Sequence, residues 1–230
     1  MGRVILLCVY AMVTCAQALA GPWTLPRDGA YTQLAVLGQR VAGEDAVRGE
    51  LYGEYGVTPR WTATGQLEGV TFPELSGFDQ FAYRATLRRQ LFQQGRFLLA
   101  FEGGVIGGEA IGGTIGGCYT VGGEARVSIG GGGRSKRGLN WFGFADAIVR
   151  EHGNCRRQRF ETGFGREIVS NWFTVNKLYL ETGTGDAQSA KLETILSRRF
   201  GNLDLGVGYR QEFGGRFQEA GIIISLERRF

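Results

Sequence analysis

The chain has 230 residues, which fits a single domain, and a formal net charge of +4. This small charge, without a basic cluster interleaved with aromatic residues, excludes a nucleic-acid partner. The 39 glycines follow no period of three and only 4 prolines are present, which excludes collagen and favours a curved sheet.

The first residues have the features of a secretory signal peptide. Arg3 precedes a short apolar run, Val4–Val13, and the small residues Ala18-Leu19-Ala20 follow it. The sequence predicts a signal peptide at 1–20, cleaved after Ala20, and one mature domain at 21–230. A lipoprotein reading through Cys15 is disfavoured by the threonine before it. The apolar run is too short to span a membrane, and no other run approaches the roughly 20 residues required.

Most of the mature chain alternates apolar and polar residues with a period of two, as a strand with two unlike faces does. The clearest case places Val47 and Leu51 on one face and Glu50 on the other. The alternation is weaker in the eighth and ninth segments, where Lys177 predicts a bulge. Each segment has roughly the ten residues that a tilted strand needs to cross a bilayer. The predicted strands are 30–37, 47–57, 61–69, 81–92, 96–106, 118–129, 139–150, 158–168, 172–182, 188–199, 203–212 and 220–230.

The connections between these strands also alternate in length. Long outer loops and short periplasmic turns are typical of outer-membrane barrels. The pattern predicts an all-β fold, a single up-and-down antiparallel transmembrane barrel of about 12 strands with both termini in the periplasm. The predicted long loops are 38–46, 70–80, 107–117, 151–157 and 213–219, the tight turns are 58–60, 93–95, 169–171 and 200–202, and the connections 130–138 and 183–187 depart from the rule.

A soluble periplasmic β-protein is the alternative, because alternation alone does not say which face meets water. Aromatic residues near the predicted periplasmic rim favour the membrane, since such rings form girdles at headgroup level. These residues are Tyr55, Trp61, Phe97, Trp141, Trp172 and Phe230.

The last predicted strand ends on Phe230 and carries Ile222, Ile224 and Leu226 at alternate positions. It resembles the closing strand of bacterial outer-membrane β-barrels, although Arg228 stands where that family prefers an apolar residue. The resemblance implies a location in the outer membrane, contact with its lipid, and recognition of these four residues by the barrel-assembly machinery.

Three stretches near the start carry a narrower resemblance. Pro22–Pro26, Gly29–Tyr31 and Tyr55–Trp61 resemble a group of proteobacterial outer-membrane barrels, porin-like proteins of which some are associated with the meta-pathway of phenol degradation. This similarity covers about a third of the mature chain and the end. It implies fold and location, and it names no solute.

The polar faces predict a lumen lined by charges of both signs. These residues either pair across neighbouring strands and fill the interior or orient a solute in a polar channel. The function we expect is passive passage or binding of a small solute through a narrow lumen; the alternative is a closed structural or adhesion-type barrel. The predicted lumen residues are Arg48, Glu50, Glu54, Glu68, Arg84, Arg88, Glu102, Glu124, Arg126, Asp146, Arg150, Asp204, Arg210 and Glu212.

The sequence offers little for catalysis. His152 is the only histidine, so no zinc site and no cofactor are expected, and we expect this residue to be solvated in an outer rim loop. A lipid hydrolase using His152 ranks third, and the prediction is that the protein is not an enzyme. Cys118 and Cys155 flank adjacent predicted strands and are expected to form a disulfide, with two thiols as the alternative.

Overall fold

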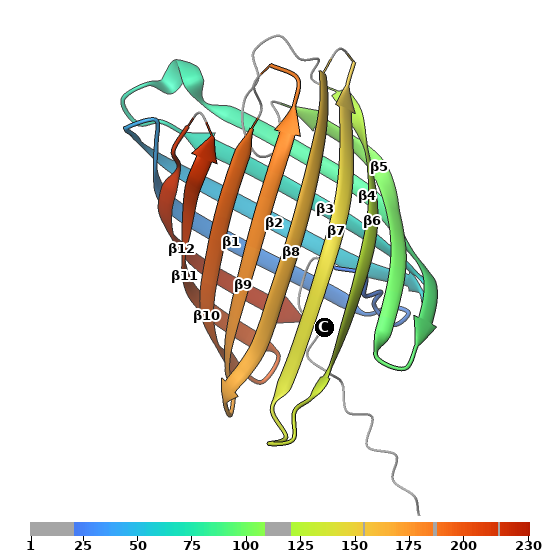
Figure 1. The fold of residues 1–230 in the computed structure, drawn as a ribbon. Coiled ribbons are helices and arrows are strands. Elements are labelled where there is room, and N and C mark those ends of the chain that lie inside the picture. Colours follow the sequence, from blue (N-terminus) through green and yellow to red (C-terminus); the bar gives the residue numbers. More distant parts are fainter. Residues whose placement is uncertain (1–20, 109–120, 154, 186–187, 216) are drawn as a thin grey trace, which may run out of the picture.

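The computed structural model describes residues 21–230 except 109–120, 154, 186–187 and 216. Antiparallel strands form one closed barrel in which each strand pairs with its neighbours in sequence and β1 pairs with β12 (Figure 1). The predicted all-β, up-and-down barrel of twelve strands is therefore confirmed. The strands are β1 Ala30–Val41, β2 Glu44–Thr58, β3 Trp61–Thr71, β4 Gln80–Gln94, β5 Phe97–Gly108, β6 Val121–Arg134, β7 Asn140–His152, β8 Cys155–Val169, β9 Trp172–Gly183, β10 Ser189–Phe200, β11 Leu203–Gly215 and β12 Ala220–Arg229.

Within the described ranges the one helical element is the 3-10 helix η1, Ser76–Phe78. No helix there is long and apolar enough to cross a membrane. The barrel closes through a regular ladder between β1 and β12, in which Leu34 pairs with Leu226 and Val36 with Ile224. Closure removes the exposed edges that an open sheet would present.

The side chains are distributed inside out relative to a soluble protein. Large apolar residues such as Leu51, Val127 and Ile224 are exposed on the outer face, while charged residues such as Glu102 and Asp146 are almost fully buried. Such an outer surface suits the hydrocarbon of a bilayer, and its strands leave no backbone edge to satisfy there. This distribution excludes the soluble alternative.

The two ends of the barrel differ in their connections. We call the end at which β1 begins and β12 ends the turn end; its connections are 59–60, 95–96, 135–139, 170–171 and 201–202. The opposite loop end has the connections 42–43, 72–79, 109–120, 153–154, 184–188 and 216–219.

Three predicted boundaries were wrong. The predicted loop 38–46 is mostly strand, since β1 and β2 meet at Ala42 and Gly43, whose positive φ values of 53° and 93° form a tight hairpin turn. The predicted loop 151–157 is likewise taken up by β7 and β8. The glycine-rich connection 130–138 shrinks because β6 continues to Arg134. Polar and glycine-rich composition suggested loops in places where the strands continue.

The predicted bulge at Lys177 was also wrong. Lys177 pairs in regular register with Gly163 on β8 and Glu193 on β10, and the nearest register shift in β8 lies between Glu167 and Val169. Lys177 interrupts an apolar pattern because it belongs to the inner face. Its Nζ lies 3.4 Å from a Glu193 carboxylate oxygen there.

Candidate functional site: the barrel lumen

All fourteen residues predicted to line the lumen lie on the inner face of the barrel. Twelve are buried, and Glu50 and Arg210 are half-buried, while their neighbours in sequence on each strand mostly point outward. Neighbouring strands bring these charges together as ion pairs. Buried charges require such partners, because an isolated ion loses the solvation of water without compensation.

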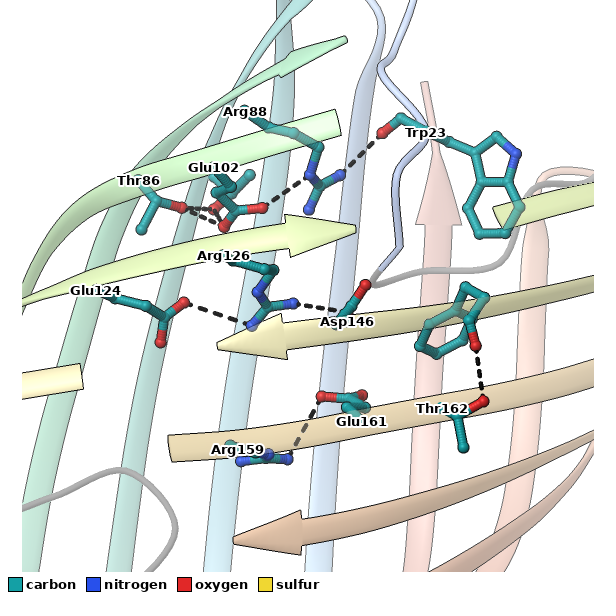
Figure 2. A network of polar contacts seen from close by, with 12 residues as sticks. Trp23, Thr86, Arg88, Glu102, Glu124, Arg126, Asp146, Arg159, Glu161 and Thr162 are labelled. Carbon is teal, nitrogen blue, oxygen red and sulfur yellow. Dashed lines mark hydrogen bonds and ion pairs between the residues drawn. The ribbon is translucent and has the colours of Figure 1, made fainter. Parts of the chain in front are cut away.

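Arg88 on β4 joins the largest number of partners on the turn-end side of the lumen. Its Nη1 lies 2.8 Å from Glu54 and its Nε 2.8 Å from Glu102, and both carboxylates are almost fully buried. The same Nη1 donates to the Trp23 carbonyl oxygen at 2.9 Å (Figure 2). Thr86 donates its hydroxyl to Glu102 as well. Arg88 therefore ties the residues before β1 to the charged wall.

Glu124 on β6 is the central carboxylate of the middle of the lumen. Arg84 Nη1 lies 3.0 Å from it, Arg126 Nη2 3.4 Å and Arg150 Nε 2.5 Å, so three strands converge on one side chain. Arg126 also reaches Asp146 at 3.2 Å. The Glu124 side chain has no exposed surface, whereas the three arginines keep 4–6 %. The carboxylate thus sits behind the guanidinium groups.

The opposite half of the lumen holds a second set of pairs. Arg210 on β11 bridges Glu193 at 2.6 Å and Glu50 at 3.2 Å. Arg48 on β2 lies 3.4 Å from Glu68 and 3.1 Å from Glu219, which precedes β12.

Glu219 lies in the connection at the loop end, outside the strands. Burial by itself would raise the pKa of its carboxyl group, but Arg48 and Lys191 outweigh burial and lower the pKa to about 2. Glu212 accepts a hydrogen bond from the Glu219 backbone N–H at 3.0 Å, which fixes the connection to β11. Asp204, by contrast, lies toward the turn end, where Arg199 and Arg229 contact it at 2.8 and 3.0 Å.

The first described residues run inside the barrel, while Pro26, Arg27 and Asp28, which lead to β1, are exposed. We call residues 21–25 the inward segment. Pro22 is fully buried and Trp23 is 9 % exposed. Leu25 donates its backbone N–H to the Thr62 hydroxyl at 2.9 Å, and Thr24 donates its hydroxyl to the Pro59 carbonyl at 3.0 Å. The segment fills part of the lumen near the turn end.

The Trp23 ring packs against two aromatic side chains of β7, Phe142 and Phe144, which we call the aromatic seat. The Trp23 ring meets Phe142 and Phe144 edge to face, with centroids 6.0 and 6.4 Å apart, and Leu98 and Ala100 of β5 complete this apolar cluster. Edge-to-face pairs of this kind add about 0.5–1.5 kcal/mol beyond the burial of their surface.

Glycines of β8 make room for the seat. Phe142 pairs across the strands with Gly165, and Phe144 with Gly163. A Cβ at Gly165 would lie 1.9 Å from the Phe142 ring, and one at Gly163 would lie 2.4 Å from the Phe144 ring. The two phenylalanine rings therefore lie directly over glycine, and a larger residue at either position would displace them.

A cavity of about 130 Å³ lies in the middle of the lumen. Its cationic lining residues outnumber its acidic ones, seven to four, because Glu124 and other carboxylates stand behind the wall. Apolar side chains of β1, β10 and β12 and the polar side chains of Gln33, Tyr52, Gln66 and Tyr179 complete the lining. The cationic residues are Arg48, Arg84, Arg126, Arg150, Arg159, Lys177 and Arg210, the acidic ones Glu50, Glu68, Glu161 and Glu193, and the apolar ones Ala35, Ile195 and Ile223.

Sequence reasoning missed part of this wall. Arg159 and Glu161 of β8, with Lys177 and Tyr179 of β9, line the cavity although the alternation of both strands reads poorly. The inner face of β8 ends in glycines, which hides the period. The charge of Lys177, placed across from Glu193 by regular strand pairing, was the signal that could have identified the face.

His152 and Cys155 lie at the loop end of β7 and β8. His152 is the last residue of β7 and is buried at 5 % exposure, so the expectation of a solvated loop histidine was wrong. It faces Cys155 in the strand register, and Cys155 is disulfide-bonded. Cys118 lies outside the described residues, so its pairing with Cys155 stays a prediction. The described residues contain no group of three His, Cys, Asp or Glu side chains that could hold a metal.

The residues proposed as an assembly signal lie on the outer face of β12 and just after it. Ile222, Ile224, Leu226 and Phe230 are 39–64 % exposed, and the Phe230 ring lies under the Arg228 guanidinium at 4.6 Å. Their recognition by the assembly machinery stays a prediction.

No family model and no curated protein matches this chain. Among solved structures, the NanC porin has a TM-score of 0.61 at 11 % identity, covering 86 % of this chain and 100 % of its own. An outer-membrane channel from Pseudomonas putida F1 has a TM-score of 0.57 at 12 % identity, covering 93 % and 100 %. LpxR from Salmonella typhimurium, an enzyme, has a TM-score of 0.57 at 7 % identity, covering 86 % and 100 %.

These similarities establish the fold. The chain is a β-barrel of the outer-membrane type, in agreement with the location predicted from the sequence. At such low identity, porins and an enzyme share the architecture, so function must be argued from the lumen itself. Membership of the group associated with phenol degradation stays a prediction.

Proposed function

We propose that the protein is an outer-membrane channel that binds a small solute in a narrow polar lumen and lets it pass without catalysis. The observation that carries this proposal is the charged cavity of about 130 Å³ in the middle of the barrel. A barrel with a purely structural role needs only a filled interior. Here seven cationic and four acidic side chains instead surround a space large enough for several water molecules.

The inward segment defines the closed state of this proposed channel. Trp23 fills the turn-end part of the lumen between Phe142 and Phe144, and Arg88 holds its carbonyl oxygen. Passage then requires the segment to move, and the rest of the wall is fixed by strand pairing. The same contacts are the observation that favours the alternative, a closed barrel without transport.

Single-channel recording in planar bilayers separates the two functions. We expect brief openings for the wild-type protein and a large rise in open probability for Trp23→Ala, because the substitution removes the ring from its aromatic seat. Trp172→Ala is the matched control, since Trp172 lies at the same end of the barrel but is exposed on the outside. Folded wild-type and Trp23→Ala barrels that both stay silent would establish the closed barrel.

The proposal assigns no catalytic role to His152, although LpxR shares the fold. His152→Ala should leave channel openings unchanged. Release of fatty acid from lipid A by the wild-type protein, lost in His152→Ala, would replace the channel with a hydrolase.

We also propose that the mature chain starts at Gly21 and that the barrel-assembly machinery inserts it by recognising the outer residues of β12. N-terminal sequencing of the outer-membrane fraction tests the first part, and a start at Met1 would contradict it. Loss of the protein from that fraction on removal of Phe230 tests the second.

A further inference from the structure

The cavity in the middle of the lumen has two unlike walls. Ala35 of β1, Ile195 of β10 and Ile223 of β12 line one side, and with Leu37 they form an apolar cluster whose members are at most 7 % exposed. Gln33, Glu193 and Arg210 of β1, β10 and β11 line the cavity beside this cluster. Because β12 stands six strands away from β6 in a closed ring of twelve, this wall faces Arg126 across the barrel.

The opposite wall presents guanidinium groups. Arg84 of β4, Arg126 of β6 and Arg159 of β8 line the cavity, and the Nε–H of each is itself buried and has no acceptor among the described residues, so the Nη groups are the ones that can reach a ligand. Arg84 and Arg126 are 6 % and 4 % exposed, so bulk water does not satisfy them. A guanidinium has five N–H donors in a planar fork that matches an oxyanion.

Aromatic rings hold two of these guanidinium groups in place. Arg84 lies 5.9 Å from the centroid of Tyr52, and Arg159 lies 4.5 Å from the centroid of Tyr179. The carboxylates that pair with these arginines leave part of each guanidinium group available to a ligand. Glu124 lies behind Arg84 and Arg126, and the nearest Glu161 oxygen lies 3.5 Å from Arg159. The guanidinium groups of this wall are therefore held in place before a solute arrives, and Figure 2 shows Arg126 and Arg159 with their carboxylate partners.

We propose that this cavity binds a small organic anion, whose carboxylate contacts Arg84, Arg126 and Arg159 and whose hydrocarbon part lies against Ala35, Ile195 and Ile223. The cavity volume of about 130 Å³ has room for a ligand of a few carbon atoms. This inference rests on the proposed function in one respect, because the anion would reach the cavity through the proposed channel. Binding itself does not depend on passage.

Isothermal titration calorimetry of the detergent-solubilised wild-type protein tests the two walls separately. Acetate, butyrate and butanol are the probes. We expect butyrate to bind roughly tenfold more tightly than acetate, from about 0.8 kcal/mol for each of its two additional CH₂ groups, and butanol not to bind. Butanol binding as tightly as butyrate would overturn the role of the arginines. Equal affinity for acetate and butyrate would overturn that of the apolar wall.

Variants then locate the site. Arg159→Gln should weaken butyrate binding at least tenfold, while Arg199→Gln should leave it unchanged, because Arg199 pairs with Asp204 away from the cavity. Equal weakening or no weakening in both variants would contradict the assignment. If Arg159→Gln does not fold, the melting temperature of the wild-type protein is measured in butyrate and in chloride at the same concentration. A melting temperature that is no higher in butyrate would refute binding.

Failure of this inference and failure of the channel proposal would give different experimental results. A barrel that conducts but binds no butyrate would overturn only this inference. A barrel that binds butyrate but stays silent in bilayers would overturn only the channel.

Discussion

The turn-end part of the lumen and its middle are built from the same strands but differ in chemistry. Toward the turn end, β7 places Phe142 and Phe144 on the inner face, and β8 places glycines beneath them. Further along the same strands the inner positions become Asp146 on β7 and Arg159 on β8. The period of two decides which side chains point inward. It does not decide whether the interior is apolar or charged.

The two regions are stabilised by different terms. Burial of Trp23 and its seat gives roughly 25 cal/mol for each Å² of apolar surface removed from water, without regard to pH. The charged region depends on the compensation of each buried ion by a partner. Arg88 connects them, since it contacts Glu54, Glu102 and the carbonyl oxygen of Trp23.

The largest expected effect comes from breaking this connection. Arg88→Ala should lower the free energy of unfolding by about 3–5 kcal/mol, because it leaves Glu54 and Glu102 buried without their cation. Urea unfolding in lipid vesicles measures the loss. Arg89→Ala is the matched control, since Arg89 is exposed on the outer face over the Trp61 ring, and should cost less than about 1 kcal/mol. Equal losses would show that the inner network adds no stability of its own.

The sequence predicted the barrel because its signals are local. Alternation, strand length and the apolar residues before Phe230 each depend on neighbours within one strand. Inner positions such as Glu102 and Arg126 followed from the same rule, because a charged residue on an apolar-polar strand identifies the polar face directly.

The inward segment could not be predicted, because its place depends on contacts between distant strands. Trp23 packs in the lumen against two phenylalanines that β7 places over two glycines of β8, and that match depends on the strand register. Phe142 and Phe144 alternate in step with Asp146 and so fall on the inner face, but nothing in the sequence shows that they hold another segment there. Ile223 alternates in step with Ser225 and Glu227 and lies inside accordingly, where it packs with Leu37 and Ile195.

The second prediction uses pH to separate the stability that comes from ion pairs from the stability that comes from the aromatic seat. The pKa of Glu219 is about 2 in the folded protein, below its ordinary value of 4.5, so its ionised form stabilises the folded state. That stability is complete above pH 4.5 and is lost as the pH falls toward 2. Glu219→Gln should therefore reduce the free energy of unfolding by about 3 kcal/mol at pH 7, and the difference from wild type should shrink below pH 4.5.

The control for this pH effect is Trp23→Ala, whose stability difference from wild type should be the same at pH 7 and pH 3, because the aromatic seat has no titrating group. Thermal unfolding at both pH values gives both differences. A Glu219→Gln difference that is constant with pH would refute the contribution of its ion pairs with Arg48 and Lys191.

The smallest effect concerns the glycines beneath the seat. Gly165→Ala adds a Cβ that would lie 1.9 Å from the Phe142 ring, so the ring and Trp23 must shift, at a cost of about 1 kcal/mol in the free energy of unfolding. Gly143→Ala on β7 is the control, because its Cβ would meet its nearest atom at 3.6 Å, an ordinary contact. We expect Gly165→Ala, and not Gly143→Ala, to increase the fluorescence quenching of Trp23 by iodide in a protein whose other tryptophans are replaced by phenylalanine. Unchanged quenching in Gly165→Ala would mean that the inward segment keeps its place without the glycine, held by its hydrogen bonds to Arg88, Thr62 and Pro59.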